Sequence, residues 1–346
     1  MLTLTTQRVS LTKLFPLAIS RGVSYGSDNL FVSITDGTHT GLGECAPGAG
    51  YDSTLASLAE QQLSAIFPGG ELPELGIIEM WSYCRERELA PPAQAAVDMA
   101  LWDLKAKQLG RPLYDLFGLS NRQAPTSVTI GINPPEVTRE RVPLILGKTG
   151  AKSLKIKLGS PEGLPHDQDH FMSAKESAAP FGVKLRVDAN GGWTVKDSIY
   201  MMAWLAQRGV DYVEQPLMEG HEDGLPQLFE RRPLPIFVDE SCRFSTSIPS
   251  FAHCVDGVNL KLMKCGGLTE AHRIVATARA HGLKTMIGCM GESSVAIGAG
   301  AAIGALFDHI DLDSHLNLNP DPAVGLGWED GVVVPSDMPG HGVRLA

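Results

Sequence analysis

The chain has 346 residues, of which 43% are hydrophobic and 20% charged, and this composition is sufficient for the large core of a globular protein. The net charge of -10 and the absence of a basic run argue against nucleic-acid binding. No apolar stretch is long enough to cross a bilayer, and the N-terminus lacks the apolar core of a signal peptide, so we expect a cytoplasmic protein. The cysteines form no CxxC pair, and we expect them to be reduced thiols.

The first 120 residues predict an α+β domain. Three segments rich in β-branched and apolar residues are typical of strands, and they cover residues 2–11, 29–37 and 39–47. Asp36 and Gly37 separate the second from the third, which indicates a hairpin turn. A helical pattern follows over 91–110, where two prolines mark the start and a glycine marks the end. A sheet followed by helices favours an α+β fold for this part.

From about residue 124 the pattern changes to strand followed by helix, repeated. Eight short apolar segments are predicted as strands at 127–132, 154–158, 184–189, 212–216, 236–240, 258–262, 285–290 and 310–314. Their spacing, about 30 residues or somewhat fewer, fits successive βα units, and eight such units close a barrel. The segment after the eighth strand is too rich in Asn, Pro and Gly for a long helix. We therefore expect a (β/α)7β barrel over 121–317, and a capping domain formed by 1–120 together with 318–346.

Three carboxylates end consecutive strands of this predicted barrel: Asp188, Glu214 and Asp239. The carboxyl ends of barrel strands form one face, where active sites are built. A carboxylate at a strand end is often only a cap for the following helix. Three of them together, however, are typical ligands of a hard cation, so the sequence predicts a site for Mg²⁺, with Mn²⁺ as an alternative.

Lysines lie on two opposite strands of the predicted ring. Lys155 and Lys157 share one face of the second strand because side chains alternate with period two. Lys261 ends the sixth strand, and Lys264 is expected on another face, in the loop that follows. A base on either side of a metal could remove a proton from the carbon next to a carboxylate, while the cation stabilises the resulting charge.

The segments ALWDLKAKQLG, VDANGGW, VEQPL, DES and NLKLMKCGGLTEA, together with the KxK motif, resemble the enolase superfamily and, within it, the muconate-lactonizing subgroup. Three local features resemble the dipeptide epimerases of the L-Ala-D/L-Glu type: ISRG at 19–22, GCMGES at 288–293 and DLD at 311–313. The resemblance implies a Mg²⁺-dependent epimerisation of the C-terminal residue of a dipeptide, with proton transfer by Lys157 and Lys261.

The same resemblance implies roles for further residues. Asp311 and Asp313 would hold the free ammonium of the dipeptide, and Arg21, in a mobile loop, would meet an acidic side chain at its C-terminal residue. Lys155 would tune Lys157 and touch the substrate carboxylate, which the metal binds. The complete substrate-binding set implied is Arg21, Thr129, Lys155, Cys289, Met290, Asp311 and Asp313. The loop after Arg21 contains no second basic residue, so the choice of substrate side chain stays open.

Other functions use parts of the same pattern. A muconate-type cycloisomerase, an o-succinylbenzoate synthase or an N-succinylamino acid racemase would share the lysines and the metal, but would have no use for two aspartates aimed at an ammonium. A non-catalytic binding module on a barrel would need neither both lysines nor all three metal ligands. Cys289 lacks a histidine partner and is expected in the wall of the site. A small dipeptide is the expected partner, and a homo-oligomer is compatible with the sequence.

Overall fold

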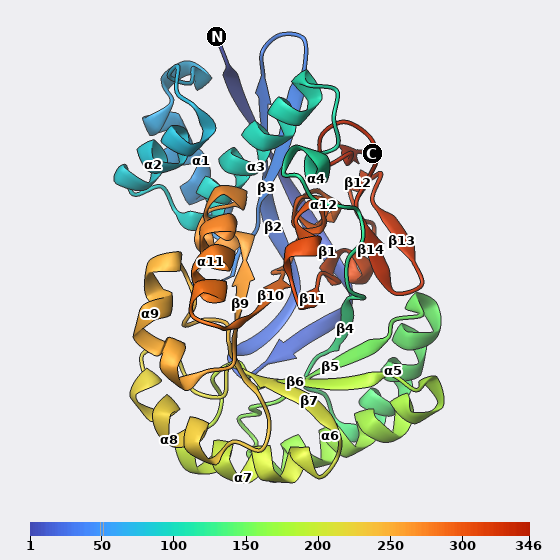
Figure 1. Cartoon of the computed structure of the whole chain (residues 1–346). Coiled ribbons are helices and arrows are strands. Elements are labelled where there is room, and N and C mark those ends of the chain that lie inside the picture. Colours follow the sequence, from blue (N-terminus) through green and yellow to red (C-terminus); the bar gives the residue numbers. More distant parts are fainter. Residues whose placement is uncertain (49, 51) are drawn as a thin grey trace.

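The computed structural model describes residues 1–48, 50 and 52–346, and Figure 1 shows a small sheet with helices standing over one end of a strand barrel. The small sheet is antiparallel, in the order β1 (Thr3–Ile19), β2 (Gly22–Thr35) and β3 (Thr40–Cys45). The Asp36 N–H donates to the His39 carbonyl at 3.2 Å, so the predicted hairpin turn is confirmed. The helices of this part are α1 (Leu55–Ile66), α2 (Ile77–Glu86), α3 (Pro91–Gln108) and α4 (Leu113–Leu116).

Helix α3 begins and ends close to the predicted residues, but it is buried on almost every side. It packs against β3 on one side and against the barrel helices on the other. A Cβ atom on Gly41 would lie 1.9 Å from the Ala100 carbonyl oxygen, and one on Gly43 would lie 2.0 Å from that of Ala96. Only glycine at these two positions of β3 lets the sheet approach α3 so closely.

The strands β1 and β2 are much longer than the sequence pattern predicted. They form one antiparallel ribbon in which Ile19 pairs with Gly22, so that Ser20 and Arg21 make the turn at its tip. The expectation of a loop at 19–22 is therefore wrong in extent, because Ile19 and Gly22 are paired strand residues and only Ser20 and Arg21 form the turn. Much of the outer half of the ribbon is only partly buried, so its sequence shows little alternation of apolar and polar residues. The sequence pattern therefore predicted strands only for the inner half.

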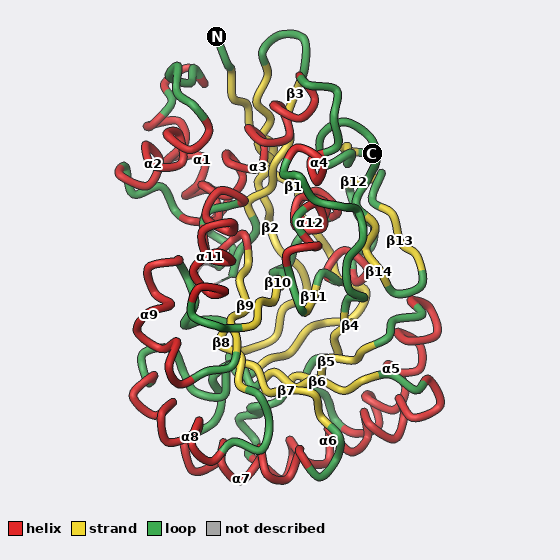
Figure 2. The backbone as a smooth tube through the Cα atoms, in the orientation of Figure 1, coloured by secondary structure: helices red, strands yellow, loops and turns green. Residues whose placement is uncertain are grey.

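The eight predicted barrel strands are all present, and each pairs in parallel with its neighbour in chain order. They are β4 (Ser127–Ile130), β5 (Ser153–Lys157), β6 (Lys184–Asp188), β7 (Val210–Glu214), β8 (Ile236–Val238), β9 (Gly257–Lys261), β10 (Lys284–Gly288) and β11 (His309–Asp311). A parallel bridge between Thr126 and Ile310 closes the ring, and the Leu312 N–H donates to Thr126 Oγ1 at 2.8 Å. Figure 2 shows the lower strands inside an arc of helices.

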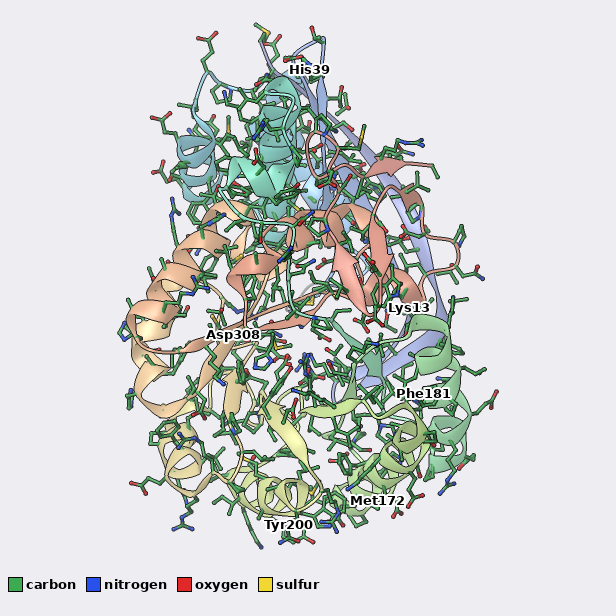
Figure 3. All side chains as sticks on the ribbon, turned by 45° about the vertical axis from the view of Figure 1, so that its right-hand side comes forward. Lys13, His39, Met172, Phe181, Tyr200 and Asp308 are labelled. Atoms are coloured by element: carbon green, nitrogen blue, oxygen red, sulfur yellow. The ribbon has the colours of Figure 1, made fainter. Side chains whose placement is uncertain are left out.

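The helices that follow these strands are α5 (Pro135–Thr149), α6 (Leu164–Ala178), α7 (Val195–Ala206), α8 (Leu225–Arg231), α9 (Ile248–Phe251), α10 (Leu262–Cys265), α11 (Leu268–Ala280) and α12 (Ser294–Ala302). Their outer faces carry exposed side chains such as Tyr200 on α7, which points away from the barrel in Figure 3. After β11, the only helical element among the described residues is a 3₁₀ turn at Ser314–Asn317. The (β/α)7β architecture is thus confirmed.

The C-terminal segment touches both parts of the molecule. It forms two small ladders, β12 (Ala323–Val324) with β15 (Arg344–Leu345) and β13 (Gly327–Glu329) with β14 (Val332–Val334). The Leu113 N–H donates to the Gly340 carbonyl at 2.7 Å, and Trp328 Nε1 donates to the Thr149 carbonyl of α5 at 2.8 Å. Among the described residues, no helix combines the length and the apolar character needed to cross a membrane.

Candidate active site

Three carboxylates meet at the carboxyl ends of adjacent strands. Asp188 and Glu214 are the last residues of β6 and β7, which place them side by side in register, and Asp239 directly follows β8. All three are buried, and one oxygen of each lies within 4.8 Å of the others. Glu214 Oε2 accepts no hydrogen bond, although it lies 2.8 Å from the Lys155 ammonium. Buried carboxylates this close need cations, so the three residues fit a divalent metal with oxygen ligands.

Two lysines of β5 enter this cluster from one side. The Lys155 ammonium lies 2.7 Å from Asp311 Oδ2 and 2.8 Å from Glu214 Oε2, and the Lys157 ammonium lies 2.6 Å from Asp188 Oδ2. Burial opposes the charge of Lys155, but the surrounding carboxylates outweigh it and raise the pKa of this ammonium well above its usual value. In the metal-free site the Lys155 ammonium therefore serves as a cation that neutralises the carboxylates around it.

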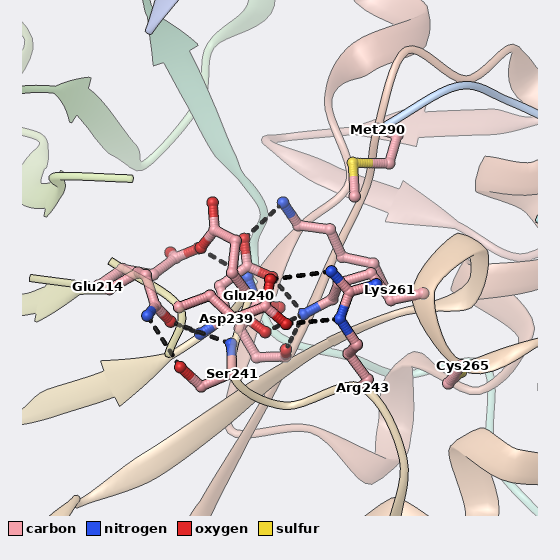
Figure 4. Close-up of polar contacts among 12 residues, drawn as sticks. Glu214, Asp239, Glu240, Ser241, Arg243, Lys261, Cys265 and Met290 are labelled. Carbon is pink, nitrogen blue, oxygen red and sulfur yellow. Dashed lines mark hydrogen bonds and ion pairs between the residues drawn. The ribbon is translucent and has the colours of Figure 1, made fainter. Parts of the chain in front are cut away.

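Lys261 reaches the cluster from the other side of the ring. It ends β9, four strands from β5, and its ammonium lies 2.8 Å from Asp239 Oδ2 (Figure 4). Lys157 and Lys261 thus contact the first and the last carboxylate of the three, Asp188 and Asp239. This places one amine on each flank of the predicted metal site, as the sequence analysis expected.

Lys264 does not lie in a loop, and that expectation is wrong. It belongs to the helical turn α10, and its side chain is buried. The ammonium donates to Asp239 Oδ1, to the Asp239 carbonyl and to the Asn259 carbonyl, so all three of its N–H groups are used. Because a helical turn begins directly after Lys261, a residue three positions further returns to the same side. Lys264 therefore fixes one oxygen of Asp239 while Lys261 contacts the other.

Substitution of Lys264 by Met should destabilise the metal-free protein by about 3–5 kcal/mol, because Asp239 Oδ1 and two carbonyls lose their lysine donor, although Lys261 still contacts Asp239 Oδ2. A matched control is Lys152→Met, which removes an ion pair to Asp330 in which both side chains are at least half exposed. That control should cost less than about 1 kcal/mol. Chemical denaturation in the presence of a chelator measures both values. Equal destabilisation of the two variants would contradict the role assigned to Lys264.

The structure brings Asp311 and Asp313 to the same part of the barrel but gives them different surroundings. Asp311 is paired with Lys155 and accepts a hydrogen bond from the Ser127 hydroxyl. Asp313 Oδ2 accepts from the Thr129 N–H at 2.7 Å, and Oδ1 lies 3.8 Å from Cys289 Sγ. Burial and the nearby Asp311 raise the pKa of Asp313 to about 6. Within the described residues no lysine or arginine forms an ion pair with Asp313, so this carboxylate is the better placed of the two to receive a ligand cation.

Arg21 closes over the same end of the barrel. From the tip of the β1–β2 ribbon, its guanidinium donates to the Asn190 carbonyl and to Glu240 Oε1, both at 2.6 Å. Asn190 lies two residues after Asp188, and Glu240 directly follows Asp239. The ribbon tip is therefore tied to the two loops that carry metal ligands, and Arg21 already has an acidic partner.

The remaining predicted substrate-binding residues lie on the wall of the site. Burial and Asp313 raise the pKa of the Cys289 thiol well above its usual value, which keeps the thiol protonated and argues against a nucleophile. Met290 packs against Gly48 of the N-terminal domain, where a Cβ atom would lie 2.6 Å from its sulfur. Thr129 is partly buried and contributes its backbone N–H to Asp313.

Two polar residues of the site were not identified as functional from the sequence. Asn259 Nδ2 donates to Glu214 Oε1 at 2.8 Å, and so helps to orient a metal ligand. Its position two residues before Lys261 on β9 was the available signal, because period two gives both the same face. Glu292 is buried behind Met290, whose N–H it accepts at 2.8 Å, and burial raises its pKa to about 8. Glu292 lies within the GCMGES segment at 288–293, but no role was assigned to it from the sequence.

Comparison with known proteins identifies the same architecture. Residues 1–118 match the mandelate racemase/muconate lactonizing enzyme N-terminal domain, and residues 139–346 match the enolase C-terminal domain-like family. A hydrophobic dipeptide epimerase of Roseobacter litoralis is 60% identical over 98% of this chain and 97% of that protein. Another, from a Flavobacteria bacterium, is 57% identical over 99% and 97%. A dipeptide epimerase from Enterococcus faecalis, solved with Mg and L-Leu-L-Tyr, superimposes with a TM-score of 0.89 at 28% identity, covering 99% of this chain and 98% of that one.

Proposed function

Because this chain belongs to the enolase superfamily, in its mandelate racemase/muconate lactonizing enzyme group, we propose that it is a Mg²⁺-dependent dipeptide epimerase. The reaction inverts the α-carbon of the C-terminal residue of the dipeptide. One structural observation carries the proposal: Lys157 and Lys261 flank the carboxylate cluster from opposite strands, each in contact with a different carboxylate. The 60% identity to a hydrophobic dipeptide epimerase over nearly the whole chain supports the same activity.

Asp188, Glu214 and Asp239 would hold the Mg²⁺, which would bind the substrate carboxylate and stabilise the negative charge that develops next to it. Lys157 and Lys261 perform the proton transfers: one amine removes the α-proton from its face, and the other ammonium delivers a proton to the opposite face. Inversion needs both residues, because each can reach only one face of the planar intermediate. Lys155 stays charged throughout and offsets the acidic residues around it.

The free ammonium of the dipeptide is recognised by Asp313, and Asp311 is a second negative charge nearby. Asp311 is already neutralised by Lys155, whereas Asp313 forms no ion pair among the described residues. A buried carboxylate without a cation gains strongly from a bound ammonium. A dipeptide held in this way would have its amino end near β11 and its carboxylate near the metal ligands, with the C-terminal α-carbon between the two lysines.

The C-terminal side chain of the substrate is hydrophobic rather than acidic. Arg21 was the expected partner of an acidic side chain, but its guanidinium is held by Glu240 and the Asn190 carbonyl. Two relatives that are more than half identical to this chain are hydrophobic dipeptide epimerases, which supports the same preference here.

The test compares free and N-acetylated L-Xaa-L-Xaa dipeptides in D₂O. The free dipeptides with apolar residues should take up deuterium at the C-terminal α-carbon and give both epimers, as measured by mass spectrometry and NMR. N-acetylation removes the charge that Asp313 recognises and should lower kcat/KM at least about 100-fold. Asp313→Asn should lower the rate with free dipeptides in the same way, but should have little effect on the slow acetylated ones. Faster turnover of N-acyl amino acids than of dipeptides would instead indicate a racemase of acylated amino acids.

A further inference from the structure

A cavity of about 340 Å³ lies beside the barrel, where the architecture leaves out an eighth helix. An eighth helix would follow β11 and pack between β11 and β4, next to α5. Here the 3₁₀ turn after β11 and part of β1 occupy this region instead. The Asn317 side chain pairs with the Phe15 backbone through two hydrogen bonds of 2.9 Å, which hold β1 at the edge of the cavity. Figure 3 brings this side of the molecule forward, with Lys13 on β1 and Phe181 beyond the end of α6.

The walls of this cavity are mainly apolar. They include Leu14, Phe15, Leu17, Ile130, Ile145 and Leu316. Two cations of α5 lie at its rim. The Arg141 guanidinium lies 5.3 Å from the centre of the Phe15 ring and donates to Asn133 Oδ1 at 3.0 Å, whereas Lys148 is exposed to solvent. An apolar cavity of this size holds water poorly, so its natural occupant is an apolar group.

Asp313 connects the cavity with the active site. Together with Thr129 it lines the cavity, and its Oδ2 accepts the Thr129 N–H across the seam between β11 and β4. Its other oxygen lies on the side of Cys289, at the end of β10. A ligand group that binds this carboxylate is therefore adjacent both to the barrel mouth and to the cavity.

We propose that the cavity receives the side chain of the N-terminal residue of the dipeptide and selects a branched aliphatic or aromatic group there. The inference rests on the proposed function, because it uses Asp313 as the site of the substrate ammonium. The ammonium nitrogen is bonded to the N-terminal α-carbon, so the side chain starts about 2.5 Å from that nitrogen. The cavity begins at the same carboxylate, and its volume exceeds what an alanine methyl group can fill. An N-terminal leucine or phenylalanine can fill it and exclude water from its walls.

The experiment measures kcat/KM for L-Leu-L-Leu and L-Ala-L-Leu, which differ only in the N-terminal side chain. The wild-type protein should prefer L-Leu-L-Leu at least about tenfold, as expected when several methylenes enter an apolar pocket. Ile145→Phe narrows the cavity from α5, outside the catalytic machinery. It should abolish this preference while changing turnover of L-Ala-L-Leu less than about twofold. Glu140→Phe places the same side chain on the exposed face of α5 and should leave both rates unchanged.

If Ile145→Phe folds poorly, Leu14→Trp is a second variant that narrows the cavity. Leu14 lines the cavity and is 38% exposed, so a larger side chain should be tolerated there. Circular dichroism confirms that each variant is folded. An equal loss for both dipeptides in both narrowing variants, or a wild-type protein that does not distinguish them, would overturn the inference. Epimerisation of both dipeptides at the same rate would leave the proposed function intact, whereas a complete lack of epimerisation by the wild-type protein would contradict the function as well.

Discussion

Lys261→Ala should lower the rate of epimerisation by at least about 10³-fold, because the opposite face of the substrate loses its only acid or base. The remaining Lys157 amine can still remove and return a proton on its own face. One epimer of the dipeptide should therefore continue to exchange its α-proton with D₂O, while the other does not. Asp239 stays paired with Lys264 in this variant, so the fold should be retained.

Lys157→Ala is the matched control for this experiment. It should abolish epimerisation to a similar extent, but the exchange should survive in the other epimer. Proton NMR of each pure epimer in D₂O measures both exchange rates directly. The two-base mechanism is wrong if either single variant interconverts the epimers at the wild-type rate, or if both variants exchange the same epimer.

Removal of Mg²⁺ by a chelator should abolish turnover, and added Mg²⁺ should restore it. Asp188, Glu214 and Asp239 each have an oxygen within 4.8 Å of the others, and no other group of three His, Cys, Asp or Glu side chains among the described residues does the same. Asp239→Asn removes one charge from the cluster and should weaken Mg²⁺ binding, which calorimetry measures independently of activity. Full activity of the metal-free protein would contradict the assignment.

The affinity for Mg²⁺ should increase with pH up to about 7. Burial raises the pKa of Glu214 to about 7, and the negative charge of the nearby Asp188 carboxylate is the second largest cause. Below that pH a proton must leave Glu214 before the metal binds, so the affinity should fall about tenfold for each unit of decrease in pH. Above pH 7 Glu214 is ionised and this dependence should disappear. Calorimetric titrations at pH 5.5, 6.5 and 8 test the slope, and Glu214→Gln should remove it.

The sequence predicted the barrel and its metal ligands because both depend on local patterns. Six of the eight barrel strands are short runs with a charged residue at or directly after the carboxyl end, and the order of strands in the ring follows the order in the chain. Period two then placed Lys155 and Lys157 together. Neither prediction required knowledge of contacts between distant segments.

The features that sequence analysis missed depend on such distant contacts. Lys155 and Asp311 are 156 positions apart, and their pairing shows that Asp311 is neutralised before any substrate binds. The role of Lys264 depends on a short helical turn directly after β9, where the pattern suggested a loop. Arg21 faces Glu240 only because β1 and β2 extend beyond their hydrophobic part, and no local pattern encodes that length.

The β1–β2 ribbon covers the end of the barrel but carries none of the proposed catalytic residues or metal ligands. Its base belongs to the core of the N-terminal sheet, whereas its tip, with Arg21, lies on the loops after β6 and β8. Side chains of a ribbon alternate with period two, so loss of one pair of residues from each strand would shorten it by about 6.6 Å without turning any side chain to the other face. Evolution can therefore vary the cover of the barrel in discrete steps, while the lysines and carboxylates on the barrel strands remain as they are.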